Sequence, residues 1–250
     1  MKNKILARLC YYLLPIVFLF LCYPLLSQTQ AEGKEEILKK TQYEESIGNY
    51  WAAVKLYNRL IKLEPANADF YYGRGVCRME LKDEQEAIDD FTKVIELKPD
   101  YGNAFKERAM AYYDLKSYKQ ALADNSKAIE LIPSEADIFY NRGLVKIKLA
   151  DSTGAYEDFD VAIKISEDHT PALMERGHLK RKNKDHNGAL EDLNKCIELE
   201  PENPLAYKYR ALIYIAQKQT EKACEDLMRA KYLGYTKQIT KLLLDNGCYD

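Results

Sequence analysis

The sequence predicts an all-α fold made of tandem helical hairpins, because it combines a 34-residue period, columns of small residues and two apolar runs per period. The period is marked by proline, with one glutamate in the series: Pro65, Pro99, Pro133, Glu167 and Pro201. Small residues follow these anchors at two constant offsets: Gly75, Ala109, Gly143, Gly177 and Ala211, then Ala87, Ala121, Ala155, Ala189 and Ala223. A fixed period of this length is the signature of a repeat array.

One period, residues 68–101, shows how each repeat is built. Apolar residues recur at helical spacing from Phe70 to Leu81 and again from Ala87 to Leu97, with a polar KDEQE segment between them. Each run is about three turns long, which is too short for a stable isolated helix in water. The small residue on each run allows the two helices to approach closely, and stacking of neighbouring repeats buries the remaining apolar surface.

Three further columns keep the same phase when residue 68 is counted as position 1 of a repeat. Position 4 holds Tyr71, Phe105, Phe139, Leu173 and Tyr207; position 24 holds Phe91, Asn125, Phe159, Leu193 and Leu227; position 27 holds Val94, Ala128, Ala162, Cys196 and Ala230. In these columns the chain resembles the tetratricopeptide repeat (TPR), which has a large residue at 4, small residues at 8, 20 and 27, an aromatic residue at 24 and proline at 32. Asn125 departs from this pattern, because it places an amide where the family packs a ring.

The resemblance implies a right-handed α-solenoid of helix-turn-helix repeats. Residues 32–237 divide into six repeats: 34–67, 68–101, 102–135, 136–169, 170–203 and 204–237. The first is degenerate, since Thr41 replaces the small residue at position 8. Residues 238–250 are expected to hold a C-terminal capping helix and tail, with Ile239, Leu242 and Leu243 on one face, because the last repeat would otherwise expose its apolar side.

The N-terminal segment 1–31 differs in composition from the repeats. A basic start with Lys2, Lys4 and Arg8 precedes the apolar run 9–26, and small residues follow it, as in a secretory signal peptide. The alternative is an uncleaved N-terminal membrane anchor, because 18 apolar residues are the lower limit for crossing a bilayer. Either interpretation predicts an exported protein, in the periplasm or outside the cell, whose only membrane contact is this segment.

The charge balance excludes a nucleic-acid binder. The formal net charge is −2 and becomes −5 when residues 1–31 are removed, with no clustered basic face. No nucleotide-binding, metalloprotease or nucleophile motif occurs, so we expect no enzyme and no cofactor. The histidines His169, His178 and His186 are spaced nine and eight residues apart, which does not place them on one helix face as metal ligands. We interpret them as solvated side chains.

Arginine occupies position 7 in five consecutive repeats and aspartate occupies position 23 in the same five: Arg74, Arg108, Arg142, Arg176 and Arg210, with Asp90, Asp124, Asp158, Asp192 and Asp226. These positions lie at about the same level of a helical hairpin, so we expect each guanidinium to form a forked ion pair with its own aspartate. The alternative is a ladder of arginines that binds phosphate or carboxylate groups.

Four cysteines follow residue 31. Cys77 and Cys196 share columns with small apolar residues and are expected to be buried thiols. Cys224 stands in an apolar column that should face the next element along the array, which for the last repeat is the capping helix, and Cys248 lies just beyond that helix. The sequence therefore predicts a disulfide between Cys224 and Cys248 in an oxidising compartment. The alternative is two unpaired thiols.

The resemblance also implies where a partner binds, because positions 2, 5, 9, 12 and 13 of TPR first helices line a concave groove. Here positions 5, 9 and 12 hold Tyr72, Val76, Met79, Lys106, Met110, Tyr113, Tyr140, Leu144, Ile147, Met174, His178 and Arg181. The strip is apolar and rich in aromatic residues and methionine, which is typical of an interaction surface. The family's carboxylate clamp is absent. We therefore expect apolar recognition of a protein or peptide segment, with Lys106, Arg181 and Lys182 favouring acidic residues at one end.

Two alternatives to this interpretation stay open at the level of sequence. The long side chains of the strip are also of a kind that covers neighbouring helices without binding a partner. The protein as a whole is alternatively a structural subunit of an envelope assembly, held by its ends and without affinity for free peptides. The sequence does not predict the oligomeric state.

Overall fold

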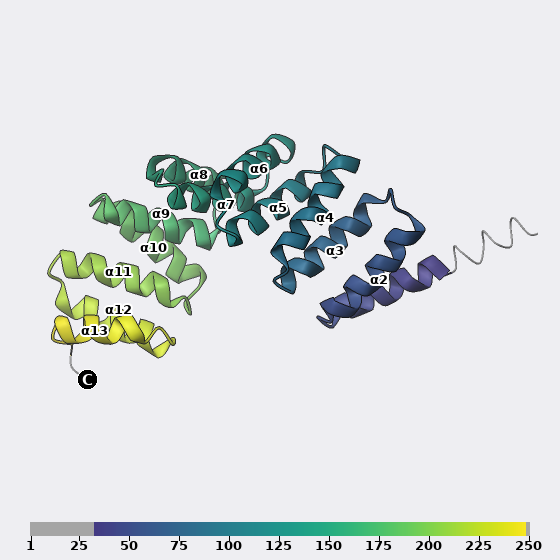
Figure 1. Cartoon of the computed structure of the whole chain (residues 1–250). Coiled ribbons are helices and arrows are strands. Elements are labelled where there is room, and N and C mark those ends of the chain that lie inside the picture. Colours follow the sequence, from purple (N-terminus) through teal and green to yellow (C-terminus); the bar gives the residue numbers. More distant parts are fainter. Residues whose placement is uncertain (1–32, 249–250) are drawn as a thin grey trace, which may run out of the picture. The chain divides into compact units, whose positions relative to one another are not determined.

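The computed structural model of the chain describes residues 33–248 and contains only helices and their connections over that range. These residues form two compact parts, one ending at Pro99 and the other beginning at Asp100. The first part contains a helix over residues 33–46, followed by α2 (Tyr50–Leu63), α3 (Ala68–Glu80) and α4 (Glu84–Leu97). Consecutive helices of this part pack as antiparallel hairpins (Figure 1).

The second part continues the same pattern with nine helices between residues 100 and 248. They are α5 (Gly102–Asp114), α6 (Tyr118–Leu131), α7 (Ala136–Lys148), α8 (Ser152–Ile165), α9 (Thr170–Lys182), α10 (His186–Leu199), α11 (Pro204–Ala216), α12 (Thr220–Tyr232) and α13 (Lys237–Asp245). Each helix packs on the next, and α5 also touches α7 and α9 touches α11. The predicted all-α fold of tandem helical hairpins is confirmed.

Local sequence explains where these helices begin and turn. Asp151 and Asp185 accept hydrogen bonds from the backbone N–H groups of Gly154 and Gly188, which caps α8 and α10. The turn inside each hairpin has one residue with positive φ at a constant place, which is Gly48 in the first repeat. In the later repeats non-glycine residues adopt this left-handed conformation: Lys82, Lys116, Ala150, Lys184 and Lys218. The packing of the hairpin therefore imposes the same turn conformation in each repeat, even where a residue with a Cβ is strained by it.

The core of each hairpin depends on the small residue of its first helix. A Cβ added to Gly143 would lie 2.5 Å from the Phe159 ring, and one added to Gly75 would lie 2.7 Å from the Phe91 ring. Glycine at position 8 thus allows the second helix to place an aromatic ring directly against the backbone of the first. The alanines of the second column are all completely buried, as the sequence predicted: Ala87, Ala121, Ala155, Ala189 and Ala223.

All five predicted Arg–Asp pairs are present. In the fourth repeat, Nε and Nη2 of Arg142 donate to the two carboxylate oxygens of Asp158 over 2.9 and 2.7 Å. The remaining pairs repeat this fork: Arg74–Asp90, Arg108–Asp124, Arg176–Asp192 and Arg210–Asp226. The aspartates are almost completely buried, so each ion pair is shielded from solvent.

A second partner of these arginines was not predicted. The Nη1 of Arg176, which is not part of the fork, donates to Asp160 over 2.7 Å, and the Nη1 of Arg210 donates to Asn194 over 2.7 Å. Both acceptors belong to the preceding repeat. Arg74 makes the corresponding bond to Asn58. Each of these guanidiniums therefore joins two consecutive repeats, which supports the structural interpretation over an anion-binding ladder.

The C-terminal helix α13 covers the last hairpin. Ile239 and Leu243 are buried against Ala211, Leu227 and Ala230. Gly234, with φ of 94°, ends α12, as its position suggests. The helix begins at Lys237, so the predicted division between residues 237 and 238 lies one residue inside it.

A disulfide joins Cys224 of α12 to Cys248, which lies three residues beyond the end of α13, with their Cα atoms 5.4 Å apart. Cys77 and Cys196 are buried free thiols. The predicted leader, residues 1–31, lies outside the described residues. Within residues 33–248, no helix combines the length and the apolar character that crossing a bilayer requires.

The Arg142–Asp158 pair should be energetically coupled. The Asp158 carboxylate is only 4% exposed and also binds the Lys146 ammonium at 2.8 Å, so Arg142→Ala removes one of its two cationic partners. This change should lower the free energy of unfolding by about 2 kcal/mol. We expect the double variant with Asp158→Ala to cost at least about 1 kcal/mol less than the sum of the single variants. Urea denaturation measures all three. Additive losses would contradict the pairing, and the exposed pair Lys127–Glu130 serves as the weakly coupled control.

The disulfide should stabilise the C-terminal cap. It closes a segment with a sequence separation of 24, for which chain-entropy arguments give about 3 kcal/mol. Replacing both Cys224 and Cys248 by serine should lower the denaturant midpoint by the same amount as adding reductant to the unmodified protein. The double variant itself should not respond to reductant. Equal midpoints for the oxidised and reduced protein would show that the bond contributes nothing.

Candidate functional site

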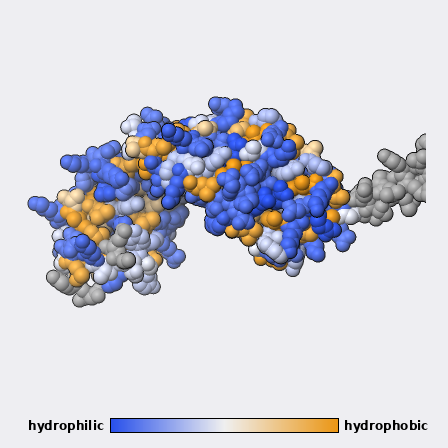
Figure 2. Space-filling view, in the orientation of Figure 1, coloured by the Kyte–Doolittle hydropathy of each residue, from blue (hydrophilic) through white to orange (hydrophobic). Residues whose placement is uncertain are grey.

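The twelve side chains of the predicted groove all lie on first helices of their hairpins. Tyr72, Val76 and Met79 are partly exposed on α3 in the first part of the chain. In the second part, α5 carries Lys106, Met110 and Tyr113, α7 carries Tyr140, Leu144 and Ile147, and α9 carries Met174, His178 and Arg181. On the face shown in Figure 2, hydrophobic residues form small patches between hydrophilic ones.

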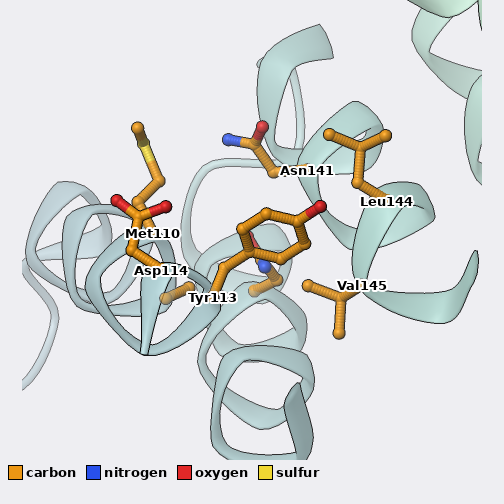
Figure 3. A pocket seen from close by; sticks show the side chains of 8 residues that line it. Met110, Tyr113, Asp114, Asn141, Leu144 and Val145 are labelled. Atoms are coloured by element: carbon orange, nitrogen blue, oxygen red, sulfur yellow. The ribbon is translucent and has the colours of Figure 1, made fainter. Parts of the chain in front are cut away.

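The structure brings three of these residues together around a cavity of about 200 Å³ between α5, α6 and α7. Figure 3 shows Met110 and Tyr113 on one side, with the Tyr113 ring reaching toward Leu144 and Val145. The lining is mainly apolar and consists of Ala109, Met110, Tyr113, Asp114, Asn125, Asn141, Leu144 and Val145. Met110, 42% exposed, lies at the solvent side. Five of these eight residues were not predicted, although the absence of a ring at Asn125 was a visible signal.

Tyr140 packs against two aromatic side chains. Its ring lies 5.8 Å from that of Phe159 and 5.3 Å from that of His169, measured between centroids. Burial, reinforced by the nearby Glu175, raises the pKa of the Tyr140 phenol to about 12. Leu144 and Ile147 also contact the hydrophobic core of this hairpin. Tyr140 and Ile147 therefore cover neighbouring helices, as the structural alternative proposed, while Leu144 does so and also lines the cavity with Met110 and Tyr113.

The α9 portion of the strip is polar and partly buried. The His178 ring lies 4.3 Å from the ring of Tyr209 on α11. Burial, together with the positive charges of Arg181, Lys182 and Lys208, lowers the pKa of His178 to about 4. His178 Nδ1 and Arg181 Nε are buried without a hydrogen-bond partner. Met174 packs against the core of the following hairpin.

The interpretation of the histidines as solvated was wrong for two of them. The side chain of His169 is only 8% exposed, because its Nδ1 caps α9 by accepting from the Ala172 N–H and its Nε2 contacts Asp137. His178 is stacked, as described above. His186 begins α10 and is partly exposed, although its Nδ1 is buried without a hydrogen-bond partner. In residues 33–248, no cluster of histidine, cysteine or carboxylate side chains has the arrangement of a metal site.

The charge expected at Lys106 is already neutralised. Its ammonium lies 3.8 Å from Glu107 and 3.5 Å from Glu135, so an acidic partner would compete with two carboxylates of the chain itself. Burial raises the pKa of Glu107 and of Glu175, which lie on α5 and α9. The basic character of the strip is therefore confined to the last turn of α9, where Arg181 and Lys182 stand.

Comparison with protein families identifies the helical repeats. Models described as tetratricopeptide repeat match residues 68–101, 170–203 and 193–225, and a model described as TPR repeat matches 46–82 and 109–149. The chain belongs to the tetratricopeptide repeat family. Members of this family bind protein or peptide partners, and the family is generally a non-catalytic interaction fold. Among curated proteins, no sequence matches this TPR chain.

Solved structures show the same TPR fold. PilF of Pseudomonas aeruginosa superposes with a TM-score of 0.77 at 15% identity, covering 87% of this chain and 99% of that protein. YrrB, described as a TPR protein with an unusual peptide-binding site, gives 0.63 at 21% identity over 76% and 97% of the two chains. A TPR protein from Parabacteroides merdae gives 0.64 at 21% identity over 86% and 98%. At these identities the likeness establishes the fold alone.

The neutral state of His178 should make stability depend on pH. Its pKa in the folded protein, about 4, lies below the ordinary value of 6.5. The stability that the neutral imidazole contributes is therefore fully present above pH 6.5 and is lost as the pH falls toward 4. Between pH 7 and pH 5, the unmodified protein should lose up to about 2 kcal/mol of unfolding free energy relative to His178→Gln. Urea denaturation at several pH values measures this difference. Parallel pH profiles would contradict it.

Proposed function

We propose that this TPR protein is a non-catalytic scaffold that binds a peptide segment of a partner protein along the first helices α5, α7 and α9. The observation that carries the proposal is the cavity between α5 and α7. Its wall is mainly apolar, and it opens beside Met110, a large hydrophobic residue that remains exposed although methionine favours burial. Tyr113 adds an aromatic side chain of the kind that anchors protein interfaces.

The chemistry of the strip indicates how a segment would bind. Apolar side chains enter beside Met110 and Tyr113, while the guanidinium of Arg181 and the exposed Lys182 at the end of α9 attract a carboxylate. Lys106 does not contribute a free charge, because Glu107 and Glu135 lie next to it. Methionine adapts its shape to different partners, so affinity would come from apolar contacts and specificity from the polar groups around them.

Export is part of the same proposal. The predicted leader at 1–31 and the disulfide between Cys224 and Cys248 both favour an oxidising compartment, such as the periplasm or the cell exterior. The arginine ladder, which could have suggested phosphate chemistry, is occupied by its own aspartates. The second candidate function, a structural subunit without affinity for free peptides, is the outcome that the following experiment distinguishes.

Selection of random displayed peptides on the immobilised protein tests the proposal. Peptides should be enriched, and Tyr113→Ala combined with Met110→Ala should weaken their binding about tenfold or more, measured by fluorescence anisotropy. Tyr232→Ala is the matched control, because this tyrosine is 81% exposed on α12, away from the strip, and should leave affinity unchanged.

Tyr140→Ala is unsuitable as a test, since loss of its packing on Phe159 would also lower stability. Failure to enrich any peptide would favour the structural subunit. Enriched peptides that bind the double variant as tightly as the unmodified protein would place the binding surface elsewhere.

A further inference from the structure

The third repeat, residues 102–135, lacks the side chain that fills the hairpin core elsewhere. Phenylalanine occupies position 24 opposite glycine in the second and fourth repeats, as Phe91 with Gly75 and Phe159 with Gly143. The sixth repeat pairs Leu227 with Ala211, and both are completely buried. The third repeat has alanine at position 8, like the sixth, but Asn125 at position 24. The cavity between α5, α6 and α7 lies at this substitution.

Asn125 destabilises the hairpin in two ways. First, it leaves a volume between apolar side chains unfilled, so that packing contacts are lost. Second, the residue is only 1% exposed and its Oδ1 is buried without a hydrogen-bond partner. The fold does not require asparagine here, because Leu227 beside Ala211 in the sixth repeat shows that leucine fits the same pair of positions. Residues that are unfavourable for folding, and not forced by the fold, are a mark of binding sites.

The size and polarity of the cavity indicate what it accepts. A cavity of 150 Å³ in another protein holds benzene, so about 200 Å³ is enough for a six-membered aromatic ring. The walls formed by Met110, Leu144 and Val145 favour such a ring, and Asn125 Oδ1 requires a hydrogen-bond donor. The amide torsion of asparagine is broad, so turning Oδ1 toward a donor costs little. A cation is disfavoured, because the only carboxylate in the lining, Asp114, is exposed to solvent.

We propose that this cavity is a specificity pocket that takes the phenol ring of a tyrosine side chain from the bound segment, with its O–H donating to Asn125 Oδ1. The inference rests on the proposed function and deepens it by naming a required residue of the partner. Met110 and Tyr113 contact the flanks of the inserted ring, and Asn125 distinguishes tyrosine from phenylalanine. A site that hydrogen-bonds a buried hydroxyl rejects the analogue that lacks it, because its own polar group is then left unpaired.

Small aromatic probes test the pocket without the partner. p-Cresol, the side-chain analogue of tyrosine, is compared with toluene and with 4-methylanisole, which has no donor. Titration is followed by NMR on methyl-labelled methionine, where Met110 reports on the pocket and Met228, 41% exposed on α12, is the internal control. We expect p-cresol to shift the Met110 signal with about tenfold higher affinity than either other probe.

Two variants separate the hydrogen bond from the volume. Asn125→Ala should bind p-cresol and toluene equally, because the space remains and the acceptor is gone. Asn125→Leu, which copies the Ala211–Leu227 pair of the sixth repeat, should raise the melting temperature and abolish binding of all three probes. Equal affinity of the unmodified protein for p-cresol and toluene, or p-cresol binding that survives Asn125→Leu, would overturn the proposal.

Peptides from the display experiment separate this inference from the function on which it rests. Tyrosine should recur at one position of the enriched peptides, and its replacement by phenylalanine should weaken binding about tenfold to the unmodified protein but not to Asn125→Ala. Enriched peptides without a recurring tyrosine would overturn the pocket and leave the scaffold function intact. Binding of p-cresol as expected, with no peptide enriched, would support the pocket as an aromatic site and overturn the peptide-binding function.

Discussion

The close contact between the backbone of each first helix and one side chain of its partner helix is the constraint on which the hairpins depend. Where that side chain is a phenylalanine, only glycine fits opposite it, as Gly143 does against Phe159. Neither helix is stable alone, so this contact decides whether a repeat folds and at what separation its helices pack. The Arg–Asp pair one residue before each of these positions depends on the same separation.

The charged network joins the hairpins to one another. Because the guanidinium is planar and has five donors, Arg176 binds Asp192 in its own repeat and Asp160 in the preceding one at the same time. This arrangement fixes the register between repeats and uses the positive charge internally. As a result, the five arginines of the ladder add no free charge to the surface of the first helices.

Two departures from regular repetition, at the C-terminus and in the third repeat, have different consequences. At the C-terminus the array would expose an apolar face, and α13 covers it with Ile239 and Leu243 while a disulfide holds the chain beyond the helix in place. In the third repeat, Asn125 lies at a cavity, whereas four other repeats place a completely buried Phe91, Phe159, Leu193 or Leu227 at the same position. The first departure completes the core, whereas the second reduces packing beside the exposed side chain of Met110.

The sequence alone determined the period, the helical hairpins, the Arg–Asp pairs and the proximity of Cys224 to Cys248, because each follows from spacing within one or two repeats. The columns carried over from the family also located Met110, Tyr113 and Leu144 beside one another. Only the tertiary structure decided that Lys106 is neutralised by Glu107 and Glu135, and that His169 is buried as a helix cap. The cavity at Asn125 likewise required three helices in place, because an unfilled volume is defined by the side chains that neighbouring helices supply or omit.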